Sequence, residues 1–161
     1  EVSSLLGAQV AGRQVASHGG NGSVVEGGRW RRAADVDHDG RPDLIVNSGN
    51  GAALAVHRNQ GDGTFQRVSL NSLTSTATSC TVADVNHDGH PDLIAAEYAA
   101  GLTSVFIGHG DGTFEPTQRL PLTATPYAMT VADLNADGKL DVAVASYDGN
   151  RVILLTNTTQ R

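Results

Sequence analysis

"DVDHDGRPDL" at residues 35–44 returns as "DVNHDGHPDL" at 84–93 and as "DLNADGKLDV" at 133–142, at an unvarying step of 49 residues. The same step relates "NQGDGTF" from residue 59 to "GHGDGTF" from residue 108, and "TVAD" from 81 to "TVAD" from 130. A fixed period of roughly 20 to 50 residues is typical of solenoids and propellers. The chain is therefore expected to be an array of one structural unit.

The length of the chain favours one domain. A chain of 161 residues with 39% hydrophobic content can bury a core but seldom forms more than one domain. We expect a single repeat domain over 1–161, with repeats near 30–78, 79–127 and 128–161. Residues 1–29 are interpreted as a degenerate N-terminal segment, because the GDGTF turn projected backward falls at "GRQVA", where only the first glycine remains.

Within each repeat the local signals are those of strands and tight turns, whereas helical periodicity is weak. Short β-favouring runs enter the acidic segment at 78–83 and 127–132, and others leave it at 93–98 and 142–147. Third strands are expected at 53–58, 103–107 and 151–156, and GDGTF predicts a hairpin turn into a fourth strand at 114–120. Four-stranded antiparallel sheets that hide their faces against one another predict an all-β fold, a β-propeller with about three blades per chain.

The negative charge of the chain is local. The formal net charge is −6, and ten of the seventeen acids lie inside the three quoted segments; without these ten, the chain has seven acids against its eleven bases. Such packing of like charge costs stability unless a cation lies among the carboxylates. Three divalent cations would bring the formal total to zero.

The spacing of oxygen-bearing side chains identifies the cation. Counted from the first Asp, they stand at positions 1, 3, 5 and 9, and Gly stands at position 6. Alternate residues of a tight loop point inward and the glycine permits the bend, so this spacing suits Ca²⁺. Position 7 needs to supply only a backbone carbonyl, which leaves its side chain free to vary. The predicted metal ligands are Asp35, Asp37, Asp39, Arg41, Asp43, Asp84, Asn86, Asp88, His90, Asp92, Asp133, Asn135, Asp137, Lys139 and Asp141.

Other cation sites fit the loops less well. His38 and His87 at position 4 suggest a transition metal, but the third repeat has Ala136 there, so solvated histidines are predicted. Mg²⁺ needs a stricter octahedron, and Zn²⁺ favours nitrogen or sulfur ligands. Asp, Asn and Gly also form turns, but turn chemistry alone does not require four oxygens at fixed offsets three times. Position 12, which carries a bidentate Glu in an EF-hand, is occupied by Val46, Ala95 and Val144.

The pattern D-x-[DN]-x-D-G-x-x-D-[LV], preceded by V-A-D and followed by a strand and G-D-G-T-F, resembles the FG-GAP or VCBS-type repeats. Such repeats occur in integrin alpha-subunit propellers, fungal lectins and many secreted bacterial proteins, and the resemblance covers roughly residues 30 to 157. It implies propeller blades whose acidic loop joins the first two strands and binds calcium, about three ions per chain. Family propellers close with about six to eight blades. Three blades therefore predict either a homodimer that forms a six-bladed ring or a piece of a longer chain.

Catalytic motifs are absent from the sequence. It contains no GxSxG elbow, no HExxH pair and no phosphate-binding glycine loop, and its clustered acids are assigned to metal. His18, His57 and His109 have no repeated acidic or nucleophilic partner and are predicted to lie in turns or on the surface. We therefore expect that the protein is not an enzyme.

The favoured function is a non-catalytic calcium-binding module for extracellular interaction or adhesion, with variable loops that meet a protein partner. The first alternative is a carbohydrate-binding lectin, which would require exposed aromatic rings repeated from blade to blade. Tyr98 and Tyr147 recur at the step of 49, with Gly49 in the first repeat. The second alternative is an accessory propeller domain of a secreted enzyme.

Nucleic acid and membrane are not predicted as partners. Arg29, Arg31 and Arg32 beside Trp30 form one short basic run without a reading motif. The chain has no apolar stretch of the roughly 18 residues that a membrane span requires.

Secretion is favoured because an extracellular Ca²⁺ affinity of about 10⁻⁴ to 10⁻³ M fills such loops only outside cells. The N-terminal residues do not resemble a signal peptide, so the chain is either intracellular or already processed. Sequons at Asn21 and Asn157 are compatible with secretion. The single cysteine, Cys80, excludes an internal disulfide and is interpreted as a structural thiol.

Overall fold

The computed structural model describes residues 31–47 and 52–159, and every regular element in these ranges is a β-strand. The predicted N-terminal segment 1–29, with its Asn21 sequon and His18, lies outside the described residues, as do Trp30 and Gly49. No helix in the described ranges has the length and apolarity needed to cross a membrane.

The strands form three antiparallel sheets, each of which follows the chain from one strand to its neighbour. The first sheet contains β1 (Arg31–Ala34), β2 (Asp43–Asn47), β3 (Ala53–Asn59) and β4 (Phe65–Ser72). The second contains β5 (Ala77–Ala83), β6 (Asp92–Glu97), β7 (Leu102–Gly108) and β8 (Phe114–Pro121). The third contains β9 (Pro126–Ala132), β10 (Asp141–Ser146) and β11 (Val152–Leu155).

The sheets agree closely with the sequence pattern. Each predicted strand is present, with ends that differ by at most one residue, and the GDGTF segments are the turns before β4 and β8. The expectation of four strands per repeat holds for the first two sheets. The third sheet has three strands within the described residues, because the place of a fourth lies beyond them.

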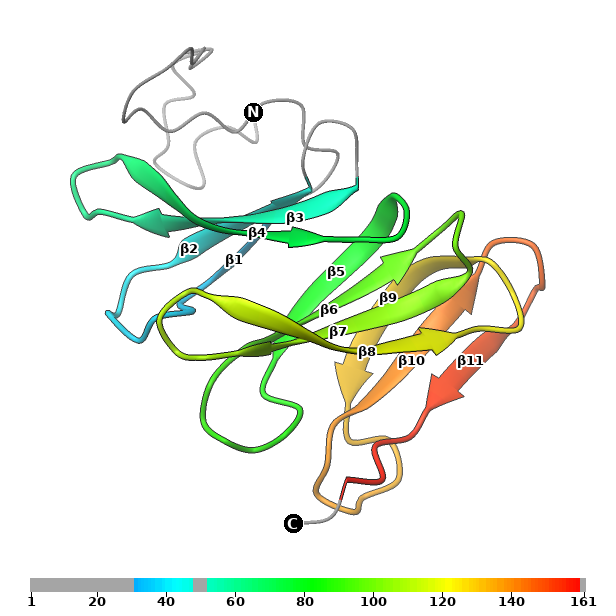
Figure 1. Ribbon diagram of the computed structural model, residues 1–161. Coiled ribbons are helices and arrows are strands. Elements are labelled where there is room, and N and C mark those ends of the chain that lie inside the picture. The colour runs from blue at the N-terminus through cyan, green and yellow to red at the C-terminus, as the bar shows by residue number, and fades with distance from the viewer. Residues whose placement is uncertain (1–30, 48–51, 160–161) are drawn as a thin grey trace, which may run out of the picture.

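The second sheet is the middle layer of the molecule, between the first and third sheets (Figure 1). Alternate residues of a strand point to opposite faces, and β6 is buried along its whole length. Leu93 and Ala95 on one face join a core cluster that includes Ile45 and Leu54 of the first sheet. Ile94 on the other face joins the cluster formed with the third sheet.

Hydrogen bonds between sheets connect their first strands. The Arg32 Nε donates to the Cys80 carbonyl at 2.9 Å between β1 and β5, and the Thr78 hydroxyl donates to the Pro126 carbonyl at 3.2 Å between β5 and β9. The residues of each pair are 48 positions apart, so both hydrogen bonds join the first strands of neighbouring sheets, although Arg32 corresponds to Thr81 in the next repeat and the two bonds use different strand positions. The sheets are thus stacked like the blades of a β-propeller (Figure 1).

The third sheet exposes its second face. Along β11, Ile153 and Leu155 pack toward the second sheet, whereas Val152 and Leu154 are 63% and 59% exposed. An uncovered sheet face with apolar side chains is unusual for a finished propeller blade, which buries both faces.

Candidate metal sites

The three acidic segments are the loops between the first and second strands of each sheet, at 35–42, 84–91 and 133–140. Position 4 of every loop has a left-handed backbone, with φ of 61° at His38, 61° at His87 and 60° at Ala136. The glycine at position 6 is also left-handed, with φ of 82°, 88° and 81° in chain order. Two left-handed residues within three positions close the loop tightly and direct alternate side chains inward.

The aspartate at position 1 offers one oxygen to a cation. Its Oδ2 accepts a hydrogen bond from the amide of the position 6 glycine, at 2.9 Å in the first and third loops and 3.0 Å in the second. The Oδ1 atoms of Asp35 and Asp84 are buried and have no hydrogen-bond partner among the described residues. A buried carboxylate oxygen without a partner is costly, so these two atoms fit a loop that holds a cation.

The side chains at positions 3 and 5 place further oxygens near the position 1 aspartate. The position 3 oxygen accepts from the amide of position 5, and the position 5 oxygen accepts from the amide of position 7, in all three loops. In the first loop, carboxylate oxygens of Asp35, Asp37 and Asp39 all lie within 4.8 Å of one another. Asn86 and Asn135 replace the second acid in the other loops, where their amides donate to Asp88 and Asp137.

The aspartate at position 9 connects the acidic loop to the end of the third strand. Asp43, Asp92 and Asp141 are fully buried. One oxygen of each accepts from the amide of position 2, at 3.0, 2.8 and 3.2 Å in chain order. The other oxygen accepts from the amides of Asn59, Gly108 and Asn157, at 2.8, 2.9 and 2.8 Å.

The basic side chain at position 7 lies across the turn that follows the third strand. The Arg41 Nε donates to the Asn59 carbonyl at 3.0 Å, and the Lys139 Nζ donates to the Thr159 carbonyl at 2.6 Å. The His90 ring lies against Gly110. The side chain at this position is therefore used in every repeat, although the sequence pattern indicated only a role for its carbonyl.

The GDGTF turns are held by their own aspartates. Asp62 accepts from the amide and hydroxyl of Thr64 at 2.9 and 2.6 Å, and Asp111 accepts from Thr113 at 2.8 and 2.5 Å. These hydrogen bonds lower the pKa of both carboxyls. In the third repeat, Asn157 stands at the position of Asn59 and Gly108, and its amide nitrogen donates to the Val85 carbonyl at 2.7 Å. The predicted sequon at Asn157 thus has a structural contact.

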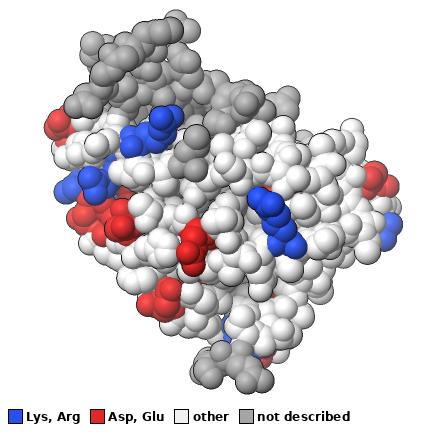
Figure 2. Space-filling view, viewed as in Figure 1, with Lys and Arg blue, Asp and Glu red and all other residues white. Residues whose placement is uncertain are grey.

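The electrostatics of the loops favour binding of positive charge. Burial raises the pKa of Asp37, and the charges of Asp43 and Asp39 raise it further. Burial likewise raises the pKa of Asp92, against the hydrogen bonds that it accepts from backbone amides. Figure 2 shows the acidic side chains gathered over the loop between β1 and β2. A dication among these oxygens would favour their ionised form.

The pKa of Asp88 is lowered, in contrast to those of Asp37 and Asp92. Burial acts to raise the pKa of its carboxyl, but hydrogen bonds from the His90 amide and Asn86, with the charges of His90 and His109, lower it overall.

Three features outside the acidic loops were missed, or found only in part, from the sequence. Glu97 at the end of β6 is fully buried and accepts hydrogen bonds from the Ser75 amide at 2.6 Å and the Ser104 hydroxyl at 2.5 Å. Its sequence signal was an acid inside a predicted apolar strand, at 93–98. The other two features are an aromatic cluster and a histidine pair. The step of 49 relates two of the three rings of the cluster, Tyr98 and Tyr147, but it gave no signal for Tyr127 or for the histidine pair, which join different positions of neighbouring repeats.

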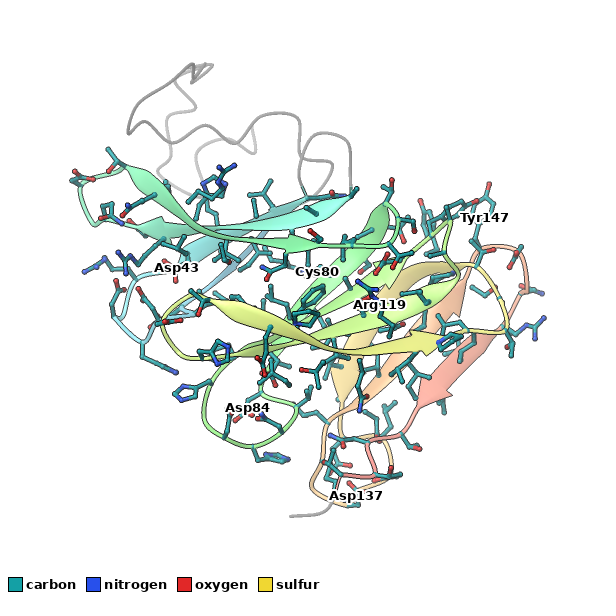
Figure 3. The ribbon with its side chains drawn as sticks, in the orientation of Figure 1. Asp43, Cys80, Asp84, Arg119, Asp137 and Tyr147 are labelled. Atoms are coloured by element: carbon teal, nitrogen blue, oxygen red, sulfur yellow. The ribbon has the colours of Figure 1, made fainter. Side chains whose placement is uncertain are left out.

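The aromatic cluster contains Tyr98, Tyr127 and Tyr147, which are 36%, 55% and 65% exposed. The Tyr147 ring centroid lies 5.7 Å from that of Tyr98 and 5.6 Å from that of Tyr127. The cluster lies at the opposite end of the strands from the acidic loops, as the labels of Tyr147, Asp84 and Asp137 show in Figure 3.

Comparisons with protein families and solved structures show what this chain is similar to. Residues 35–95 and 84–144 each match the family model described as FG-GAP-like repeat. The crystal structure described as BBS1N in complex with ARL6DN, soaked with lead, is similar with a TM-score of 0.57 at 15% sequence identity. The similarity covers 85% of this chain and 46% of the BBS1N chain, so this chain spans about half the length of the solved one. At 15% identity, the similarity supports the fold alone. A comparison with curated proteins found no match.

Proposed function

The chain belongs to the family of FG-GAP-like repeat proteins, and from this premise we propose that it is a non-catalytic propeller module whose acidic loops bind Ca²⁺. The observation that carries the proposal is the pair of buried, partnerless oxygens, Asp35 Oδ1 and Asp84 Oδ1. Carboxylate, amide and carbonyl oxygens are the ligands that Ca²⁺ prefers, at six to eight per ion. The fifteen residues identified from the sequence are the proposed ligands.

Within each loop the five positions have different roles. Side-chain oxygens at positions 1, 3 and 5 face the ion, and position 7 supplies its carbonyl. A carboxylate has about four lone-pair sites, so position 9 retains two after accepting its two backbone hydrogen bonds. Bound Ca²⁺ offsets the repulsion among the acids and rigidifies the loop. The position 9 aspartate connects the rigid loop to the third strand through its hydrogen bond from the amide at the end of that strand.

The proposed biological role is extracellular interaction or adhesion, with secretion as the proposed location. Loops of this ligand type in extracellular modules have dissociation constants of about 10⁻⁴ to 10⁻³ M, which suits the calcium concentration outside cells. The uncovered face of the third sheet, with Val152 and Leu154, supports a further blade packed against it. A second copy of the chain or the remainder of a longer chain would supply that blade.

Calorimetric titration with calcium, together with a mass measurement in solution, tests this proposal. We expect about three ions per chain for the unchanged protein. The triple variant Asp35→Asn, Asp84→Asn, Asp133→Asn should lose them, because each change removes the inward carboxylate of one loop. The matched control is Asp62→Asn with Asp111→Asn, which changes acids of the GDGTF turns. Absence of binding by the unchanged protein, or equal loss in the control, would contradict the proposal.

Carbohydrate binding is the second candidate, favoured by the contact among Tyr98, Tyr127 and Tyr147. Exposed aromatic rings stack on the apolar faces of sugars, and three adjoining rings form a larger platform than the two that the repeat predicted. Glycan-array binding that is lost in Tyr98→Ala and Tyr147→Ala, but retained in the control Leu134→Ala, would support this function. A blank array would leave the interaction module as the remaining candidate.

A further inference from the structure

A pair of histidines joins the first two sheets at their acidic ends. The His38 Nε2 lies 3.3 Å from the His90 Nδ1, with ring centroids 5.4 Å apart and planes inclined by 49°. His38 is position 4 of the first acidic loop, and His90 is position 7 of the second. The contact therefore links two loops that are 52 residues apart in the chain.

Backbone features place both rings. His38 has a left-handed φ of 61° between two inward-pointing aspartates, which turns its side chain away from the loop interior. His90 lies on Gly110, where a Cβ would fall 2.4 Å from its Nδ1 and 2.6 Å from its Cε1. Any larger residue at position 110 would displace the ring, so this glycine is required for the observed position of His90.

The separation of the two nitrogens matches that of two ligands on one tetrahedral zinc ion. Zn–N bonds of about 2.0–2.1 Å at a tetrahedral angle place two ligand nitrogens about 3.3–3.4 Å apart. Imidazole nitrogens suit zinc, copper and nickel, whereas the oxygens of the acidic loops suit calcium. A hydrogen bond between the neutral rings would have a similar length, and the two arrangements differ in their response to added zinc.

We propose that His38 and His90 form a transition-metal site that binds Zn²⁺ and bridges the first two sheets. The His38 side chain is exposed and the pair lies at the surface, so the ion can enter and water can fill its remaining coordination positions. The Asp88 carboxylate interacts electrostatically with both His90 and His109, so the surroundings of the pair are favourable for a cation. This site uses ring nitrogens, whereas His90 contributes only its backbone carbonyl to the proposed calcium site, so the two kinds of site use different ligand atoms.

Titration of the calcium-saturated protein with zinc chloride in a calorimeter tests the site near neutral pH. We expect one Zn²⁺ per chain, lost in His38→Ala and in His90→Ala. Loss of a mere outer-shell partner costs about 10- to 100-fold in metal affinity, so loss of a ligand should weaken zinc binding at least that much. Gly110→Ala should also weaken it, because the added Cβ displaces the His90 ring.

The matched control is His87→Ala, which removes the exposed histidine at position 4 of the second loop and should leave zinc binding unchanged. In the unchanged protein, zinc should protect His38 and His90 from diethylpyrocarbonate more than it protects His87, which tests the site without any substitution. Equal zinc binding in His38→Ala, or zinc that excess calcium displaces, would overturn the proposal. Calcium titration of the same variants keeps this result separate from the proposed calcium sites.

Discussion

Position 9 of each acidic loop is an aspartate whose two carboxylate oxygens accept hydrogen bonds from two different segments of the chain. Asp92 accepts from the Val85 amide within its own loop and from the Gly108 amide at the end of β7. The side chain is fully buried, so both hydrogen bonds are shielded from water. The aspartate therefore orders the loop even before a cation binds.

Asp92→Asn should destabilise the protein in the presence of a calcium chelator. The side chain of Asn has one acceptor oxygen and one NH₂ group. One of the two backbone amides therefore loses its acceptor and faces the NH₂ group, which is also a donor. A buried donor left unsatisfied costs about 1–3 kcal/mol in the free energy of unfolding. Urea denaturation measures the loss. Glu115→Gln on the exposed side of β8 is the control and should change the free energy by about 0.5 kcal/mol or less; equal stability of the two variants would contradict the role of Asp92.

Ala136 occupies a backbone conformation that costs energy for a residue with a Cβ. Its φ of 60° is left-handed, at a cost of roughly 1–2 kcal/mol that glycine avoids. Ala136→Gly should raise the free energy of unfolding by up to about 1 kcal/mol, since the greater freedom of glycine in the unfolded chain offsets part of the gain. Ala128→Gly in β9 is the control and should lower stability. A loss of stability in Ala136→Gly, measured by thermal unfolding, would contradict this explanation.

At the scale of the element, the strands were largely predictable because each repeat alternates turn residues with short β-favouring runs. The sequence therefore gives β6 and β10 to within one residue at each end. The tyrosine cluster was only partly predictable, since periodicity relates equal positions. Tyr98 and Tyr147 recur at the step of 49, but Tyr127 has Thr78 at its equivalent position and meets them only through the packing of adjacent sheets.

His57 in β3 was predicted to lie in a turn or on the surface, and this prediction was wrong. It is in the middle of a strand, 6% exposed, and its Nδ1 has no hydrogen-bond partner among the described residues. The sequence signal that could have found it was its place within the predicted strand at 53–58. Burial, with a smaller contribution from the charge of Arg67, lowers the pKa of His57 below 6.5.

The lowered pKa predicts loss of stability in acid. The unfolded chain binds a proton at this histidine near pH 6.5 while the folded chain does not, so stability should fall as pH drops below 6.5 toward the folded-state pKa. His57→Leu should flatten this part of the profile, and Arg67→Gln should reduce the loss. Denaturation at a series of pH values measures both, and an unchanged slope in His57→Leu would contradict the assignment.

At the scale of the whole molecule, three small sheets share their cores, so the stability of each depends on its neighbours. Cys80 lies in the cluster between the first and second sheets, where it is 1% exposed. Burial raises the pKa of its thiol from 9.0 to about 12. The thiol is therefore inert in the folded protein and becomes reactive when the sheets separate.

Removal of calcium should open this core. A site held at a hundred times its dissociation constant contributes about 2.7 kcal/mol, so three independent sites contribute roughly 8 kcal/mol. For a domain of this size each kcal/mol changes Tm by about 2–4 °C. The product of these values is roughly 15–30 °C, so a chelator should lower Tm by more than about ten degrees and should speed Cys80 labelling by a thiol reagent. A shift below about two degrees would contradict a structural role for the ions.

The aromatic cluster and the acidic loops lie at opposite ends of the same strands (Figure 3). The six residues of β6 separate them by about 20 Å, at roughly 3.3 Å per residue. Mutation can therefore remodel one end without altering the chemistry of the other. Substitutions at the tyrosine end would therefore change which molecules that surface can bind and leave the acidic loops at the other end unchanged.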